Sequence, residues 1–288
     1  MTLIYDRKLK ETYTESEVGG RVVTFLYETA LGRFLLKPLL YPAFSNFKAA
    51  RNNTKRSVRK IKPFVEKYHI NLDEAEQTTF QSFNDFFTRR LRPAARSISE
   101  AKTTVIAVAD SKLMTYPISE SGVFQIKNRS YTLNELIRDT RVAEQFIGGT
   151  CLVFRLAIDD YHRYCYPDAG KKLAARMIPG MLHSVRPLAH AHARVFSENT
   201  RHWQLFETEN FGRVLFMEVG ALLVGRIHDH GATVFTKGQE KGYFSYGGSS
   251  IVVCYQKNQV KIAEDIAAAN REGLEVRVSY GEKVGSHA

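Results

Sequence analysis

Two short segments concentrate the residue types that can do chemistry. Residues 156–170, LAIDDYHRYCYPDAG, bring adjacent aspartates, a histidine and a cysteine together where a strand is predicted to end. In residues 237–256, the sequence Gly247–Gly248–Ser249–Ser250 stands directly before a run of β-branched residues. A Gly-Gly pair can adopt backbone conformations closed to other residues, so it can present a carbonyl to the hydroxyl that follows. A hairpin turn is the alternative interpretation of the same residues.

Most familiar catalytic patterns are missing from the sequence. It contains no GxGxxG after a strand, no GxxxxGK[ST], no HExxH and no GxSxG. Two histidine pairs, His190/His192 and His228/His230, have the spacing that puts both rings on one face of a strand, as a metal pair needs. No third ligand is suggested by spacing, so we predict no metal site.

The elements that must position these groups fall into two regions. Apolar residues recur at helical spacing from Val22 to Phe34, and Pro38 and Pro42 are expected to end or kink this helix. From about Thr103 onward, apolar runs punctuated by Gly and Pro predict strands, with helical patterns only at 132–138 and 261–270. We therefore predict an α+β protein: a helical region at 1–98, then a mostly antiparallel, β-rich catalytic domain at 99–288.

Composition excludes several protein classes. The 288 residues are 44% hydrophobic and 25% charged, enough for a large core and unlike a disordered or collagen-like chain. Three widely spaced cysteines exclude a disulfide scaffold and favour reduced thiols. We expect no secretory signal, because the first residues carry both charge signs without an apolar stretch. The most apolar segment, 22–47, is interrupted by charges and prolines, so it can lie on a membrane more readily than cross it.

The charge of the chain is concentrated in one stretch. The net charge is +11, and residues 48–67 contain eight Lys and Arg against one Glu. Beside an apolar helix, such a stretch predicts contact with an anionic membrane surface. The residues that we expect to insert or to hold headgroups are Phe25, Leu35, Leu36, Lys55, Arg56 and Arg59. A solvated helix face and a nucleic-acid-binding surface are the alternatives, although no binding module is recognisable.

Five blocks, in order along the chain, resemble the phosphatidylserine decarboxylase family of pyruvoyl-dependent, self-processing enzymes. They are FNDFFTRRLRPAARSI (83–98), AVADSK (107–112), DYHRYCYPDAG (160–170), FGRVLFMEVGALLVGRI (211–227) and KGQEKGYFSYGGSSIVV (237–253). The resemblance implies a decarboxylase of phosphatidylserine, peripheral on the cytoplasmic face of the cell membrane, with a homo-oligomer possible and no nucleic-acid partner. A soluble amino acid or an archaeal-type serine lipid is the alternative substrate.

The same resemblance implies roles for individual residues. The hydroxyl of Ser249 would attack the carbonyl of Gly248, cutting the chain into 1–248 and 249–288 and turning Ser249 into a pyruvoyl group. Asp110 would have a charged role in that step, and His162 would be the general acid/base. The pyruvoyl carbonyl would form a Schiff base with the substrate amine and act as electron sink while carbon dioxide leaves.

One position departs from the family pattern. A second histidine commonly stands three residues after the first, where this chain has Cys165. A thiol with an ordinary pKa of about 8.5 is a poor base near neutrality, whereas imidazole titrates near pH 6.5. We therefore favour His183, in GMLHSVRP, as the substitute base for self-processing, and keep Cys165 as the alternative. Ser111 and Ser250 replace a usual glycine and threonine.

Overall fold

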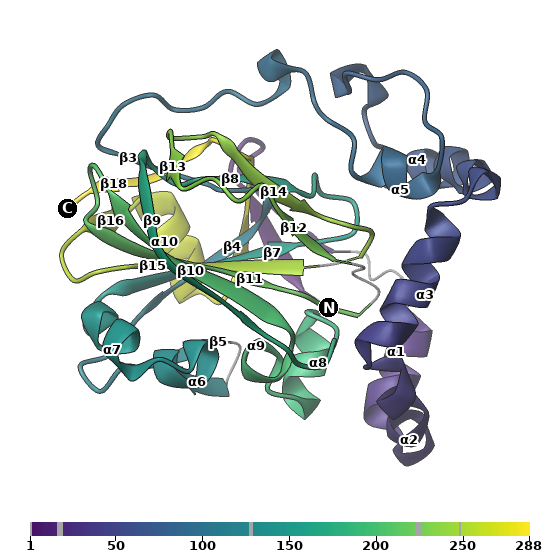
Figure 1. Ribbon diagram of the computed structural model, residues 1–288, viewed down its shortest axis with the longest axis horizontal. Helices are drawn as coiled ribbons and strands as arrows, with labels where there is room; N and C mark the ends of the chain where they lie inside the picture. The colour runs from purple at the N-terminus through teal and green to yellow at the C-terminus, as the bar shows by residue number, and fades with distance from the viewer. Residues whose placement is uncertain (1, 16–19, 127–128, 223–225, 248) are drawn as a thin grey trace.

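The computed structural model describes residues 2–15, 20–126, 129–222, 226–247 and 249–288, and a broad twisted sheet forms its centre (Figure 1). Ten strands of the described residues form this sheet. In spatial order they are β13 (Val234–Phe235), β9 (Gly170–Ile178), β10 (Arg201–Thr208), β11 (Arg213–Val219), β15 (Ser249–Tyr255), β7 (Thr150–Leu156), β4 (Ser111–Pro117), β17 (Glu275–Val278), β1 (Leu3–Asp6) and β2 (Glu11–Thr14). Neighbours pair antiparallel except β1 with β17, so the predicted α+β class with a mostly antiparallel sheet is confirmed.

The central strands are buried on both faces, which explains their continuous apolar runs. On β15, Ile251 and Val253 face one core, while Val252 and Cys254 face the other. The first core contains Tyr164 and Phe244 of a small sheet that covers one face. That sheet has the order β12 (Ile227–Asp229), β14 (Glu240–Phe244) and β8 (Arg163–Cys165).

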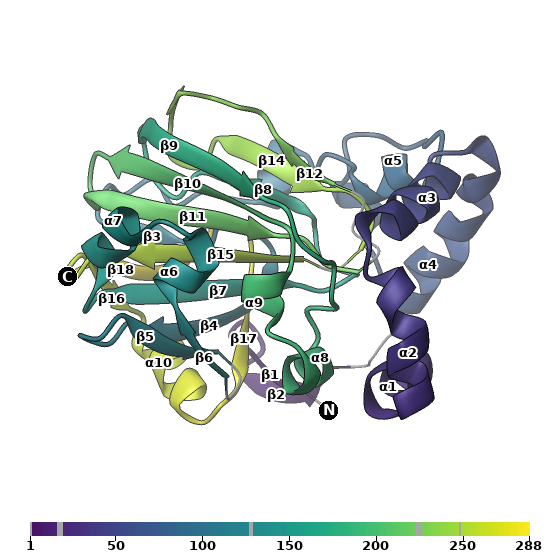
Figure 2. The same ribbon diagram turned by 60° about the horizontal axis from the view of Figure 1, so that its bottom comes forward.

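The second core lies under short elements on the opposite face of the sheet (Figure 2). They are the hairpin β5 (Val123–Ile126) and β6 (Arg129–Thr132) with helices α6 (Leu133–Ile137), α7 (Thr140–Ala143) and α9 (Val195–Glu198). Helix α8 (Pro187–His192) precedes α9. Near the carboxyl terminus lie β16 (Val260–Ile262), α10 (Glu264–Arg271) and β18 (Lys283–His287), and β18 also pairs with β3 (Thr104–Ile106).

The helical pattern at 132–138 becomes α6, which begins at a capping box between Thr132 and Glu135. The pattern at 261–270 becomes α10, although its first residues belong to β16. All three cysteines are buried and free.

Helices of the first third lie together beside one end of the sheet, at the right in Figures 1 and 2. They are α1 (Gly20–Glu28), α2 (Ala30–Leu39), α3 (Pro42–Asn52), α4 (Ile61–Tyr68) and α5 (Phe83–Phe87). The predicted continuous helix is interrupted at Thr29, whose extended backbone and side chain cap α2. Pro38 lies in the last turn of α2, and Pro42 is the first residue of α3. Within the described ranges, no helix is both long and apolar enough to span a membrane.

Two expectations for this region need correction. The first residues are not helical, because β1 and β2 extend the central sheet, so the helical segment begins at Gly20. Leu36 is only 4% exposed and packs in the core with Tyr27 and Leu40, so it is not available to a membrane. The predicted helical spacing is found in α2, but the face of α2 that carries Leu36 packs against the protein and not against solvent.

Candidate active site

Ser249 is the first residue of β15 and is fully buried. Its backbone pairs with Leu156 at the end of β7, and its side chain projects with Ile251 toward the first core. Among the described residues, no group forms a hydrogen bond with its Oγ. A buried hydroxyl without a partner is uncommon, and it marks a place where another group can engage that oxygen. Gly248, the other predicted cleavage residue, lies outside the described residues.

His162 is also fully buried and lies just before β8. Its Nε2 lies 2.9 Å from the carbonyl oxygen of Ala157, and its Nδ1 has no hydrogen-bond partner within the described part of the chain. The ring packs on Phe87 with a centroid separation of 4.4 Å. Burial lowers the pKa of His162 to about 4, although the hydrogen bond to Ala157 opposes this shift, so the ring is neutral at pH 7.

Two independent connections bring His162 and Ser249 to the same place. Ala157, which holds the imidazole, directly follows Leu156, the cross-strand partner of Ser249. Phe87, which packs against the imidazole, also contacts Tyr246 three residues before Ser249, at a centroid separation of 5.0 Å. A neutral imidazole with a free nitrogen therefore lies in the same buried region as a hydroxyl without a partner.

Asp110 lies at the start of β4, at the same end of the sheet. Lys112 of β4 pairs with Arg155 of β7, which pairs in turn with Ser250, so β7 separates Asp110 from Ser249. The guanidinium of Arg96 binds the Asp110 carboxylate through both Nε and Nη2, at 2.6–3.1 Å. The backbone N–H of Tyr280 donates to the same carboxylate at 2.7 Å. Asp110 is thus a half-buried junction between distant segments, and none of its described hydrogen bonds is to Ser249 or His162.

Cys165 has the properties of an inert thiol. It ends β8 and is fully buried, with its backbone N–H bonded to Val108. Burial raises the pKa of its thiol to about 12, although a hydrogen bond with the Tyr280 hydroxyl lowers it slightly. A thiol of this kind carries almost no thiolate near neutrality, so the geometry gives Cys165 no support as a base.

His183 lies in a loop between β9 and α8, not on a neighbouring strand. Its Nδ1 is 3.4 Å from the Tyr27 hydroxyl and its Nε2 is 3.4 Å from the Glu198 carboxylate. Asn199 links the backbone of His183 to Gly220, just beyond the end of β11. The ring therefore joins α1 to the β-rich domain, and none of its described contacts connects it with Ser249.

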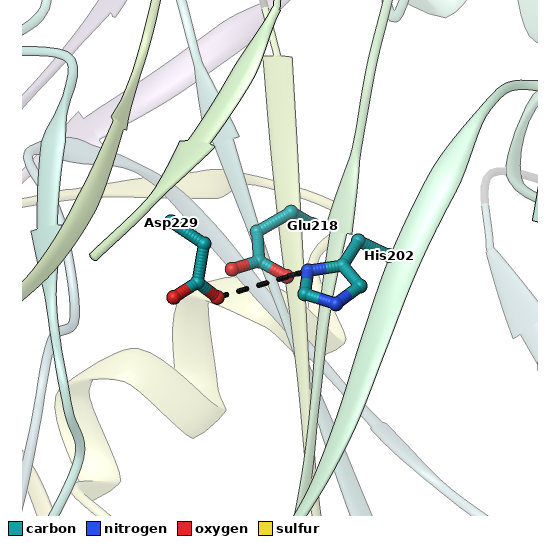
Figure 3. Close-up of side chains that lie close together, drawn as sticks. All are labelled: His202, Glu218 and Asp229. Atoms are coloured by element: carbon teal, nitrogen blue, oxygen red, sulfur yellow. Dashed lines mark ion pairs between the residues drawn. The ribbon is translucent and has the colours of Figure 1, made fainter. Parts of the chain in front are cut away.

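A second polar cluster lies between the central sheet and the small sheet (Figure 3). His202 Nδ1 is 3.5 Å from Glu218 Oε2 and 3.7 Å from Asp229 Oδ2, and the three ligand atoms lie within 4.8 Å of one another. The fully buried ammonium of Lys241 donates to both carboxylates, so a cation already occupies this place. A divalent ion would lie beside that ammonium, and the residues therefore fit an ion-pair network better than a metal site.

Within the described ranges, neither of the two histidine pairs noted in the sequence belongs to a cluster of three or more possible metal ligands. His228 Nε2 contacts the Ser245 hydroxyl at 2.8 Å, and His230 contacts Glu240 at 2.6 Å. His190 stacks on Phe196 in α9.

Sequence reasoning singled out the blocks but missed some residues that build the site. Phe87 and Arg96 belong to the block at 83–98, and Tyr280 lies outside every block. The sequence assigned no role to individual residues of the block at 83–98. In the structure Phe87 packs against His162, and Arg96 binds the carboxylate of Asp110. Tyr280 left no signal in the sequence, because its contribution to Asp110 is a backbone N–H.

Comparison with known proteins gives one answer over nearly the whole chain. The family model "Phosphatidylserine decarboxylase" matches residues 83–286. A phosphatidylserine decarboxylase proenzyme 2 of Clostridium acetobutylicum is 44% identical, covering 98% of this chain and 97% of its own. Phosphatidylserine decarboxylase proenzymes of Ruminiclostridium cellulolyticum and Clostridium botulinum are 39% and 37% identical, each covering 99% of this chain, with 98% and 99% of their own lengths matched.

Proposed function

The chain belongs to the phosphatidylserine decarboxylase family and converts phosphatidylserine into phosphatidylethanolamine and carbon dioxide, and we propose that it does so with a pyruvoyl group made from its own Ser249. The observation that carries the proposal is the buried, unpartnered Oγ of Ser249 in the same buried region as a neutral His162 with a free Nδ1. Once formed, the pyruvoyl carbonyl would supply an electron sink for the electrons that the departing carboxylate leaves behind.

The group arises by self-cleavage between Gly248 and Ser249. The Oγ of Ser249 attacks the Gly248 carbonyl carbon, the C–N bond breaks, and the peptide becomes an ester with a free amine on residue 249. Loss of the Cα proton then expels the carboxylate of Gly248, and hydrolysis releases ammonia and leaves a keto group at residue 249. The products are chains 1–248 and 249–288.

His162 is the general base and acid in this proposal. A serine hydroxyl is a weak nucleophile until a base accepts its proton. His162 suits that role because its ring is neutral at pH 7 and its Nδ1 is free to accept a proton. Cys165 suits it less because burial raises the pKa of its thiol, and His183 because its ring contacts Tyr27 instead. After decarboxylation the same nitrogen returns a proton to the substrate carbon.

In this proposal Asp110 supports self-processing by holding chain segments in place, without contacting Ser249. Its carboxylate binds Arg96 in the block at 83–98 and Tyr280 in the future smaller chain. The junction keeps these segments together at the end of the sheet where cleavage occurs.

Replacement of Ser249 tests the proposal. Ser249→Ala should give a single uncut chain without decarboxylase activity, while Ser249→Cys should still cut, but slowly. Ser250→Ala is the matched control, because the neighbouring serine undergoes the same change and projects to the opposite face. Intact-mass measurement identifies the two chains and the blocked amino terminus of the smaller one. A Ser249→Ala chain that split after Gly248 would refute the mechanism.

We also propose that the helical segment binds the cytoplasmic face of the membrane. Large apolar side chains are exposed together on this segment and mark an interaction surface. They are Val22, Phe25, Leu31, Phe34, Leu35, Tyr41 and Phe47. Lys55, Arg56 and Arg59 are exposed nearby and would hold anionic headgroups, including that of the substrate.

Charge reversal tests this surface. Each basic residue near an anionic membrane contributes about 1 kcal/mol, so changing Lys55, Arg56 and Arg59 to Glu should weaken binding to phosphatidylserine vesicles at least about 100-fold at low salt. The loss should shrink at high salt because the charges are screened. Exposed residues away from the helices provide the control triple, Lys102→Glu, Lys261→Glu and Lys283→Glu. Equal losses for the two triples would refute a specific surface.

A further inference from the structure

A buried ion pair between Lys112 and Asp160 supports the turn that contacts the His162 ring. The Nζ of Lys112 is 2.8 Å from both carboxylate oxygens of Asp160, and the two side chains are 3% and 10% exposed. Burial raises the pKa of Asp160 to about 6 while Lys112 opposes that shift, so the carboxylate is ionised at pH 7. A buried pair of this kind is costly to desolvate and is therefore weak evidence for a purely stabilising role.

The ion pair holds the turn that follows β7. Asp160 accepts the backbone N–H of Ala157 at 2.7 Å through its side chain, and its own backbone N–H donates to the Ala157 carbonyl at 3.1 Å. The same carbonyl lies 2.9 Å from Nε2 of His162. Lys112, on the strand next to β7, thus holds the Asp160 carboxylate, which binds the N–H of Ala157. The carbonyl of the same residue accepts the backbone N–H of Asp160 and meets the imidazole, so Asp160 holds Ala157 from both sides.

This contact determines which nitrogen of His162 is basic. A carbonyl oxygen can only accept, so Nε2 must carry the proton in the neutral ring and Nδ1 must carry the lone pair. If the turn rotated and the carbonyl moved away, the ring would lose the group that selects its tautomer.

We propose that Lys112 and Asp160 are positioning residues that hold the neutral His162 ring in its Nε2–H tautomer, with Nδ1 as the base. The proposal rests on the proposed role of His162 in self-processing and decarboxylation. It also gives a function to Asp160, the aspartate of DYHR, and to Lys112, the lysine of ADSK, two residues to which the family resemblance assigned none.

The first test is spectroscopic and independent of activity. In the uncut Ser249→Ala chain labelled with ¹⁵N, two-bond ¹H–¹⁵N spectra of the imidazole rings identify each tautomer, and the signal that disappears in Ser249→Ala/His162→Gln belongs to His162. We expect the Nε2–H form in the parent and a mixture of both tautomers after Asp160→Asn. Asp159→Asn, at the adjacent exposed carboxylate, is the matched control and should retain the Nε2–H form.

The second test is kinetic. Asp160→Asn in the processed enzyme should lower kcat about tenfold or more with little change in KM, since a well-placed general acid or base contributes about 10²- to 10⁴-fold. Asp160→Glu, which retains the charge, should recover part of kcat. Lys112→Gln/Asp160→Asn removes both charges, so it keeps the test valid if a lone buried charge prevents folding.

The outcomes separate the two proposals. An unchanged tautomer and an unchanged kcat in Asp160→Asn and in the double variant would overturn the positioning role alone. If His162→Gln cut and turned over normally, the proposed role of His162 would fail, whatever the tautomer spectra showed.

Discussion

The ionisation of His162 predicts how the stability of the precursor depends on pH. In the folded chain its pKa is about 4, and in the unfolded chain it is about 6.5. Between these values the unfolded state binds a proton that the folded state does not, so stability falls as pH falls through this window. The full difference corresponds to about 3 kcal/mol, of which about 2 kcal/mol is lost between pH 7 and pH 5.

Urea unfolding of the uncut Ser249→Ala chain at pH 7 and pH 5 measures this loss. Other groups also titrate in this range, including Asp160, so the same measurement on Ser249→Ala/His162→Gln provides the reference. The glutamine does not titrate and retains an N–H for the Ala157 carbonyl. We expect the histidine chain to lose about 2 kcal/mol more than the glutamine chain. Equal losses in both chains would mean that His162 is not held neutral by burial, which would remove the physical basis for its role as a base.

Three further outcomes follow from the site. Asp110→Asn should slow self-cleavage, seen as uncut chain in a time course after synthesis, because the amide cannot replace a carboxylate that binds Arg96 and Tyr280; normal cutting would contradict this. Cys165→Ser should cut at nearly the normal rate, because the buried thiol is neutral at pH 7. His183→Ala should loosen the contact with Tyr27 yet still permit cleavage; complete loss of cutting would restore it as the base.

Much of the site was accessible from the sequence because its residues lie in compact blocks. The segments around Asp110, His162 and Ser249 each contain several unusual residues within a short range, so their resemblance to a family was specific. The alternating cores of β15 and the capped helix at 132–138 also follow from local patterns. The choice between His183 and Cys165 depends on tertiary contacts, since sequence distance says nothing about which groups a side chain meets.

The chemical character of each block and the kind of reaction were determined by the sequence itself, because they depend on residue types next to one another in the chain. The state of those residues was decided by tertiary structure. Burial lowers the pKa of His162 and raises that of Cys165, and the Ala157 carbonyl lies 2.9 Å from Nε2 of His162. The face of α2 that contains Leu36 was likewise settled by packing. These properties depend on desolvation and on partners from distant segments, which a linear pattern does not encode.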